Sequence, residues 1–320
     1  MSAVANQIPR ADRIVRTFNA DAFAFSADVH APIQKAIDKQ ALVTLPSMGG
    51  YDYKPAEPNR IDGIVSYGGG YAQVGGYTSA DGTVITLATA VVEELNILDV
   101  LTCDRIVAQI TTEHAPNSLV PSVSFLGTRF DNLRITRKEL EIEPYHDILG
   151  DKPNNDESYL NDDGVLSRIA QQYSKIRSTV GVPKWASDQF NWDPAAVDRQ
   201  QIKCSLVKSV SGAPGKSYGH VIDVPFFGRI FLAELTIRRV VKTVPAKAEL
   251  SAGPRLETSR ADSSNTGSSN TDSSTSSSSS STSTGYQITL TGVNAQLTGG
   301  GASGSVTGSQ ADPNGNGGKG

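Results

Sequence analysis

Short segments of β-forming residues, separated by turn signals at regular intervals, fill residues 61–111. Stretches such as TVITLATAVV combine β-branched and other apolar residues, a composition typical of strands. The dipeptide Asp81-Gly82 favours a two-residue hairpin turn. Strands and turns at this spacing predict an all-β sandwich or barrel, and we expect strands at 61–67, 71–77, 83–92 and 105–111.

Similar signals continue on both sides of this segment. Phe23, Phe25 and Ala27 alternate with Ala22, Ala24 and Ser26, which predicts a strand with one strongly apolar face. Residues 51–60, YDYKPAEPNR, are rich in tyrosine, proline and charge, so we expect a loop there. Further strands are expected at 41–45, 120–127, 138–143, 201–211, 218–224 and 229–244.

Between residues 160 and 192 the period changes from that of a strand to that of a helix. Apolar residues recur at helical spacing until Gly181, and Asp162 and Asp163 precede them as helix N-caps. A second helical turn is expected near Trp185 and Phe190. We expect a helical insertion whose apolar stripe packs on the sheet; the stripe consists of Val165, Leu166, Ile169, Ala170, Tyr173 and Ile176.

The C-terminal part divides by composition. Residues 258–285 are rich in Ser and Thr and contain no large apolar residue, which predicts a flexible tether. A strand is expected at 286–297, where Tyr286, Ile288 and Leu290 alternate with polar residues. Residues 298–320 are rich in Gly, Ser and Asn, and we expect them to be disordered or irregular. The predicted division is therefore 1–257, a mainly β sandwich or jelly-roll-like domain, followed by these three segments.

A strand at the end of a tether has two ways to pair. It can return to its own sheet and cover an edge, or it can join the sheet of a neighbouring subunit. Effective concentration favours the strand's own chain. The second alternative predicts an assembly strand containing Tyr286, Ile288 and Leu290, and a homo-oligomer or polymer.

Composition excludes several classes of partner. Charged residues make up 19% of the chain and the net charge is −4, which argues against a nucleic-acid binder and against a polybasic membrane-surface protein. No apolar run reaches the length of a transmembrane helix. The N-terminus lacks the apolar core of a secretory signal, yet the Ser/Thr/Gly-rich tails resemble extracellular sequences, so both a cytoplasmic and an extracellular or cell-surface location stay open.

The chain has two cysteines, Cys103 and Cys204, both in strand-like segments. Two thiols are too few for a zinc-ribbon site. Two interpretations stay open, namely two buried small hydrophobic residues or one disulfide that closes a long loop. No histidine is placed so that the sequence links it to either thiol, so we do not expect a catalytic cysteine.

The glycine-rich segment SYGGGYAQVGGY lacks the Lys-Ser/Thr and the following helix of a phosphate-binding loop. Its small residues fit close packing of a sheet. Tyr67, Tyr71 and Tyr77 could instead form a stacking platform for a sugar or a base. In that alternative, Trp185 and Trp192 are further candidates for ligand binding.

The remaining titratable residues carry no specific motif. His30, His114, His146 and His220 show none of the spacings of a zinc site, and the carboxylates at 156–164 lack the spacing of a calcium loop. We find no nucleophile elbow, kinase motifs or dinucleotide-binding motif, so we expect no catalytic residue, metal or cofactor. If the protein is an enzyme, the acid–base candidates are Asp99, Asp104, His220 and Asp223.

Three segments carry a resemblance, namely residues 61–115, SVSFLGTRFDNLRI and GHVIDVPFFGRIFLAEL. They resemble a group of uncharacterised bacterial β-rich proteins and are distantly similar to surface proteins of the choice-of-anchor type. The resemblance covers residues 14–240 and implies an all-β domain without a known activity. The Ser-rich tract before the last strand departs from the pattern.

These observations predict a non-catalytic structural or interaction protein that self-assembles, for example into filaments, by β-strand addition. The alternative is a carbohydrate-binding module, and the third hypothesis is a glycan-acting enzyme.

Overall fold

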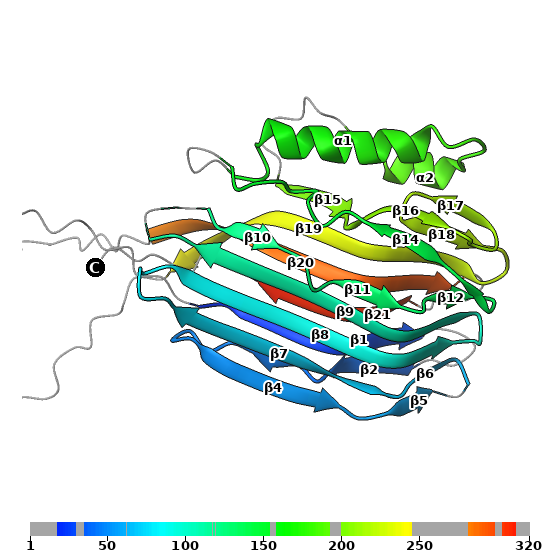
Figure 1. Ribbon diagram of the computed structural model, residues 1–320, viewed down its shortest axis with the longest axis horizontal. Coiled ribbons are helices and arrows are strands. Elements are labelled where there is room, and N and C mark those ends of the chain that lie inside the picture. The colour runs from blue at the N-terminus through cyan, green and yellow to red at the C-terminus, as the bar shows by residue number, and fades with distance from the viewer. Residues whose placement is uncertain are drawn as a thin grey trace, which may run out of the picture. The chain divides into compact units, whose positions relative to one another are not determined.

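The computed structural model describes residues 18–29, 35–61, 63–116, 118, 120–153, 158–192, 200–244, 281–297 and 303–311. The chain divides into two units, 1–240 with 285–320, and 241–284. The first unit contains the fold, and in the second the described residues are the end of one strand and the start of the next. The first unit is mainly β, with antiparallel sheets and two helices (Figure 1). The predicted fold class is confirmed.

One large sheet, called sheet B, has ten strands built around a long hairpin. This hairpin pairs β8 with β9 in register from Val84↔His114 to Ile97↔Leu101. Its strands are β4 (Gly50–Ala56), β5 (Asn59–Ile61), β6 (Val65–Tyr67), β7 (Gly69–Thr78), β8 (Val84–Ile97), β9 (Leu101–His114), β10 (Ser122–Ser124), β11 (Arg129–Asp131), β12 (Arg134–Ile135) and β13 (Lys138–Glu139).

The turn from β7 to β8 lies where the sequence predicts it. The Asp81 carboxylate accepts hydrogen bonds from the Thr83 amide (3.1 Å) and hydroxyl (2.9 Å), and from the Ser79 hydroxyl. These bonds hold the pKa of Asp81 below its usual value.

The second large sheet, sheet A, has nine strands, with a main order of β17-β18-β19-β20-β21-β1-β2. Its strands are β1 (Ala20–Val29), β2 (Lys35–Gln40), β3 (Val43–Thr44), β15 (Gln201–Ser205), β17 (Lys216–Tyr218), β18 (Val221–Val224), β19 (Gly228–Val244), β20 (Ser281–Leu297) and β21 (Ser303–Ala311). A small third sheet pairs β14 (Glu141–Pro144) with β16 (Val207–Ser211).

The C-terminal strands β20 and β21 pair with each other and are called the terminal hairpin. The hairpin lies in the interior of sheet A, between β19 and β1. Two expectations are corrected. Residues 281–285 belong to β20 rather than to the tether, and residues 303–311, expected to be irregular, form β21. The rest of the predicted tether, 258–280, lies outside the described residues.

The two large sheets pack face to face, with β1 and β21 against β7, β8 and β9. Small side chains on β1 allow this close approach, because Ala20, Ala22 and Ala24 are fully buried. The register of β1 against β2 shifts between Phe25 and Ala27. The predicted apolar face is therefore only partly correct: Phe25 and Ala27 are buried, but Phe23 is half-buried, with the Lys39 ammonium 4.8 Å from its ring centroid.

The helical insertion consists of α1 (Asp163–Arg177) and α2 (Lys184–Gln189). Asp162 caps α1, because its carboxylate accepts a hydrogen bond from the Val165 amide at 2.7 Å. The predicted apolar stripe faces inward, apart from the half-buried Ala170. Gln172 anchors the helix, since its side chain exchanges hydrogen bonds with the Ser205 backbone and donates to the Val207 carbonyl.

Candidate binding site on the outer face of sheet B

The residues predicted as a loop at 51–60 form strand β4 over Gly50–Ala56, which pairs with β7. The expectation of a loop is therefore wrong there. A strand points alternate residues to opposite faces. On β7, Ala72, Val74 and Gly76 are buried between the sheets, whereas Tyr71, Gln73 and Tyr77 point outward.

The pairing places two more tyrosines beside these residues. Tyr51 lies opposite Gly75, and Tyr53 lies opposite Gln73. Tyr51, Tyr53, Tyr71 and Tyr77 therefore share one face of the sheet, and we call these four residues, with Gln73, the tyrosine face. The exposed fractions are 66% for Tyr51, 48% for Tyr53 and 59% for Tyr77.

The rings on this face are held in place by local contacts. The rings of Tyr53 and Tyr71 are tilted by 34° with centroids 5.5 Å apart. The Tyr51 hydroxyl donates a hydrogen bond to Gln73 Oε1 at 3.3 Å. The Tyr51 ring lies over Gly75, where even an added Cβ atom would be at an ordinary contact distance of 3.8 Å.

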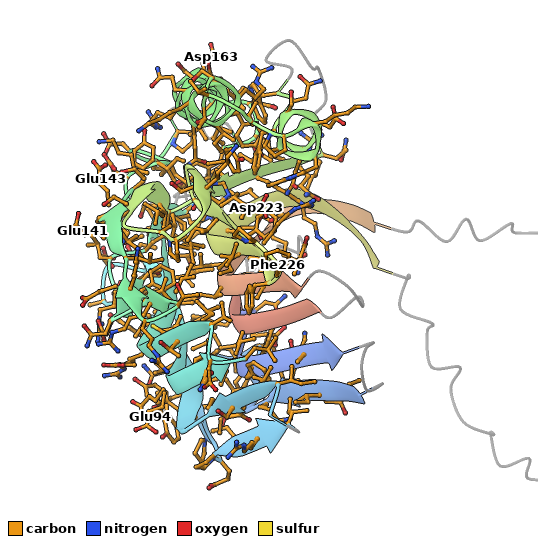
Figure 2. The ribbon with its side chains drawn as sticks, turned by 90° about the vertical axis from the view of Figure 1, so that its right-hand side faces the viewer. Glu94, Glu141, Glu143, Asp163, Asp223 and Phe226 are labelled. Atoms are coloured by element: carbon orange, nitrogen blue, oxygen red, sulfur yellow. The ribbon has the colours of Figure 1, made fainter. Side chains whose placement is uncertain are left out.

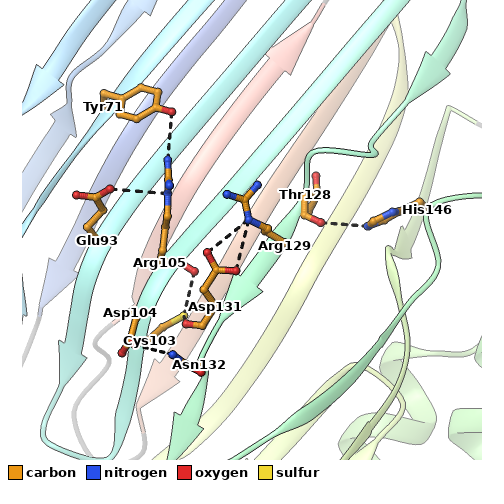
Figure 3. Close-up of polar contacts among 10 residues, drawn as sticks. All are labelled: Tyr71, Glu93, Cys103, Asp104, Arg105, Thr128, Arg129, Asp131, Asn132 and His146. Atoms are coloured by element: carbon orange, nitrogen blue, oxygen red, sulfur yellow. Dashed lines mark hydrogen bonds and ion pairs between the residues drawn. The ribbon is translucent and has the colours of Figure 1, made fainter.

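Polar groups border the tyrosine face on β8 and β9 (Figure 3). The Arg105 guanidinium donates to the Tyr71 hydroxyl at 3.4 Å, and its Nε lies 3.7 Å from Glu93 Oε1. Farther along, the Asp104 carboxylate accepts hydrogen bonds from the side-chain amide of Asn132 at 2.7 Å and from the Arg134 guanidinium at 3.3 Å. Positive and negative side chains thus alternate beside the rings, so the border offers both hydrogen-bond donors and acceptors.

A backbone irregularity in the β8–β9 hairpin lies between the Glu93–Arg105 pair and the group around Asp104. Glu94 has a left-handed φ of 51° and is exposed beside Gly68 (Figure 2). Before it, the even-numbered residues from Thr86 to Val92 are buried, together with Thr89 and Val91, and after it, Leu95 and Ile97 are buried. Glu93 and Arg105 therefore stay together on the outer face, where they pair across the strands.

The structure separates the five aromatic residues that the sequence suggests for ligand binding. Tyr71 and Tyr77 lie on the tyrosine face. Tyr67 is only 3% exposed, and its ring lies 5.0 Å from that of Phe25. Tyr67 is thus a core residue, and burial raises its pKa.

The two tryptophans belong to the helical insertion instead. The ring of Trp185 is covered by the Arg229 guanidinium at 3.8 Å. The ring of Trp192 meets that of Tyr173 edge-on at 5.5 Å. Both are half-buried against the core, so neither extends the tyrosine face.

The acid–base candidates are not brought together. Asp99 lies in the turn between β8 and β9, bonded to Asn96, and Asp104 lies on β9. His220 and Asp223 belong to the β17–β18 region of sheet A. His146 Nε2 lies 3.1 Å from the Thr128 carbonyl oxygen, His114 is buried at the end of β9, and His30 lies outside the described residues.

Among the described residues, no group of three or more His, Cys, Asp or Glu could hold a metal ion. In the same part of the chain, no helix has the length and apolar character needed to cross a membrane.

Both cysteines are buried free thiols. Cys103 lies on β9 and donates to the carbonyl oxygens of Arg105 (3.3 Å) and Asp131 (3.2 Å), whereas Cys204 lies on β15 in the other large sheet. Burial raises the pKa of each thiol to about 12. The disulfide that the sequence left open is not formed, and the thiols act as small buried side chains.

The candidate assembly strand is β20. Ile288 and Leu290 on it are buried in the core of sheet A, as are Val293 and Ala295. The side chain of Tyr286 lies outside the described part of the chain. The strand pairs within its own chain.

Comparison with known protein families identifies a match over most of the chain. The model of a domain of unknown function, DUF8256, matches residues 16–238. The chain belongs to the DUF8256 family. The matched region of this DUF8256 protein ends within β19, before the terminal hairpin. No curated protein and no solved structure matches the chain, and the resemblance to choice-of-anchor surface proteins stays a prediction without support from these comparisons.

Proposed function

We propose that this DUF8256 protein is a non-catalytic binding protein whose tyrosine face holds an extended carbohydrate. The observation that supports this proposal is the row of exposed tyrosines that β4 and β7 place on one open face of sheet B.

The chemistry of the face suits a sugar polymer. The C–H face of a sugar ring packs on an aromatic ring, which supplies apolar contact area, while a tyrosine hydroxyl also forms hydrogen bonds. Gln73, Glu93 and Arg105 lie among or beside the rings and offer donors and acceptors for sugar hydroxyls. The single exposed apolar residues elsewhere need no such explanation.

The spacing of the tyrosines favours a long ligand. Tyr71 and Tyr77 are six positions apart on one strand, and at about 3.3 Å per residue they are separated by roughly 20 Å. A single sugar unit cannot contact both rings. The proposal therefore specifies a linear oligosaccharide or polysaccharide. Since such polymers are abundant outside cells, an extracellular location belongs to the same proposal.

The test is a screen of linear oligosaccharides, followed by titration calorimetry of each binder with variants of the full chain. We expect Tyr51→Ala and Tyr77→Ala each to weaken binding by about two- to tenfold, since one ring contact is worth roughly 0.5–1.5 kcal/mol. Phe226→Ala is the matched control, because Phe226 is a fully exposed aromatic residue in the β18–β19 turn (Figure 2). Unchanged affinity in both tyrosine variants would refute the proposal, as would the absence of any binder.

Assembly by strand exchange is the second candidate function, favoured by the position of the terminal hairpin. Two of the edge strands are poor acceptors for a further strand, because β2 is charged and β4 contains Pro55. A copy whose own hairpin is released would instead offer the gap between β19 and β1.

Negative-stain electron microscopy at increasing protein concentration tests this second candidate. We expect filaments or rings in which each copy receives the hairpin of a neighbour. Monodisperse single particles at every concentration would contradict strand exchange and would mean that each hairpin pairs within its own chain.

A further inference from the structure

A small cavity lies beneath the helical insertion, where two strands of sheet A separate. β20 occupies one side of β19, and β15 and β18 follow one another along the other side. The cavity has a volume of about 100 Å³. It lies beside β19, between the part of β19 that pairs with β18 and the part that pairs with β15. It is lined by Tyr173, Gln189, Phe190, Lys203, Cys204, His220 and Glu234.

His220 is the polar group of the cavity that lacks a partner. Its side chain is only 2% exposed, and Nδ1 has no hydrogen-bond partner among the described residues. Burial lowers the pKa of this imidazole to about 3, so the ring is neutral at physiological pH. A buried polar atom without a partner is unfavourable and calls for a bound group.

The other lining groups are already engaged or apolar. The Tyr173 hydroxyl donates to the Lys203 carbonyl at 2.9 Å, and the Phe190 ring meets the His220 ring edge-on at 5.5 Å. Burial keeps the Cys204 thiol protonated. The Glu234 carboxyl lies near Lys203 and bonds to the Asn294 side chain. The imidazole is therefore left to hydrogen-bond to a ligand.

Size and charge restrict that ligand. An apolar cavity of about 150 Å³ holds benzene, so a cavity of this size suits about four non-hydrogen atoms. A charged ligand would have no opposite charge to pair with, because the imidazole is neutral. The opposite charges of Lys203 and Glu234 compensate each other. Entry is open, because Gln189 and Lys203 are exposed at the cavity's margin.

We propose that this cavity binds a small uncharged molecule with an O–H or N–H group, such as a short alcohol or a primary amide, through a hydrogen bond to His220. The site is independent of the tyrosine face, which lies on sheet B.

Acetamide, which has four non-hydrogen atoms, is the probe. It is titrated into the ¹⁵N-labelled full chain while the imidazole nitrogens of His220 and His146 are followed by NMR. We expect the His220 signals to shift and saturate at millimolar acetamide, the affinity within reach of so small a ligand. The His146 signals should stay in place, because His146 does not line the cavity.

Two variants test the site further. His220→Phe removes the hydrogen-bonding group, and Cys204→Leu fills the cavity but keeps His220; binding should weaken at least tenfold in both. The measurement on the unaltered chain decides the outcome if a variant fails to fold. His220 signals that do not move, that never saturate, or that respond equally in Cys204→Leu would overturn the proposal, as would contacts of His220 with water alone in the presence of acetamide.

Discussion

Single residues on β7 show how closely the two sheets approach. A Cβ atom at Gly76 would come within 2.5 Å of Phe18 and 2.7 Å of Leu45. We predict that Gly76→Ala destabilises the fold by about 1–2 kcal/mol, because overpacking outweighs the entropic gain of replacing glycine. Urea denaturation monitored by tryptophan fluorescence measures the change.

Gly75 is the matched control for this prediction. It precedes Gly76 on the same strand but faces outward, where the nearest side-chain atom to an added Cβ lies at 3.8 Å. Gly75→Ala should change the free energy of unfolding by less than about 0.5 kcal/mol. Equal effects at the two positions would contradict the assignment of the inner and outer faces.

His220 makes stability depend on pH. Its pKa is lowered from 6.5 to about 3 in the folded chain, so below pH 6.5 the unfolded chain binds a proton that the folded chain does not. The stabilising contribution is complete above pH 6.5 and is lost as the pH falls toward 3, at up to about 1.4 kcal/mol per pH unit. Urea denaturation between pH 7.5 and 5 measures this loss.

The variant His220→Gln separates this effect from other titrations. The difference in unfolding free energy between the unaltered chain and His220→Gln should shrink as the pH falls. A constant difference for His220→Gln across the range would show that His220 is not a buried neutral base.

The sequence could predict part of the tyrosine face. Tyr71 and Tyr77 share a period of two, but Tyr67 belongs to β6, and the chain breaks between the two strands at Gly68 and at Gly69, the first residue of β7, which has a φ of 137°. The sequence alone does not reveal this break in the alternation. Tyr51 and Tyr53 also alternate, yet Pro55 and the charges around them are typical of a loop. Pairing with β7 overrides that local preference.

At the scale of elements, the terminal hairpin connects the two parts of sheet A. Without it, β1, β2 and β3 would be separated from β15, β17, β18 and β19. We predict that a chain ending at Leu256 fails to fold and aggregates, because β1 and β19 would expose unpaired edges. Size-exclusion chromatography and circular dichroism of this truncated chain test the prediction.

Addition of the missing segment provides the control. A peptide of residues 281–311, present during refolding, should restore a monodisperse protein, whereas a peptide of the same composition in scrambled order should not. A truncated chain that is folded and monomeric by itself would show that the hairpin is dispensable.

The elements differ in how far local sequence determines them. α1 is predictable because its cap, apolar stripe and length all agree. β21 is not, since SGSVTGSQA contains a single large apolar residue, Val306. Its strand conformation depends on pairing with β1 on one side and β20 on the other, which is tertiary information.

At the scale of the whole molecule, the two thiols report on the two sheets, since Cys103 lies in sheet B and Cys204 in sheet A. We predict that neither reacts with a bulky aromatic disulfide reagent at pH 8 until the protein unfolds, because both are buried with pKa values of about 12. The two should then react at the same rate as denaturant is raised. Reaction of Cys204 alone below the unfolding midpoint would show that sheet A opens separately.

The position of the terminal hairpin also determines when the protein can fold during its synthesis. β1 is synthesised well before its partner β21, which ends at residue 311. At roughly 5–20 residues per second, β1 lacks β21 until residue 311 has been made, and β19 lacks β20 until residue 297 has been made. Throughout that interval sheet A of the nascent chain is incomplete, and the yield of folded protein in a cell therefore depends on what protects the open sides of β1 and β19 until the terminal hairpin emerges.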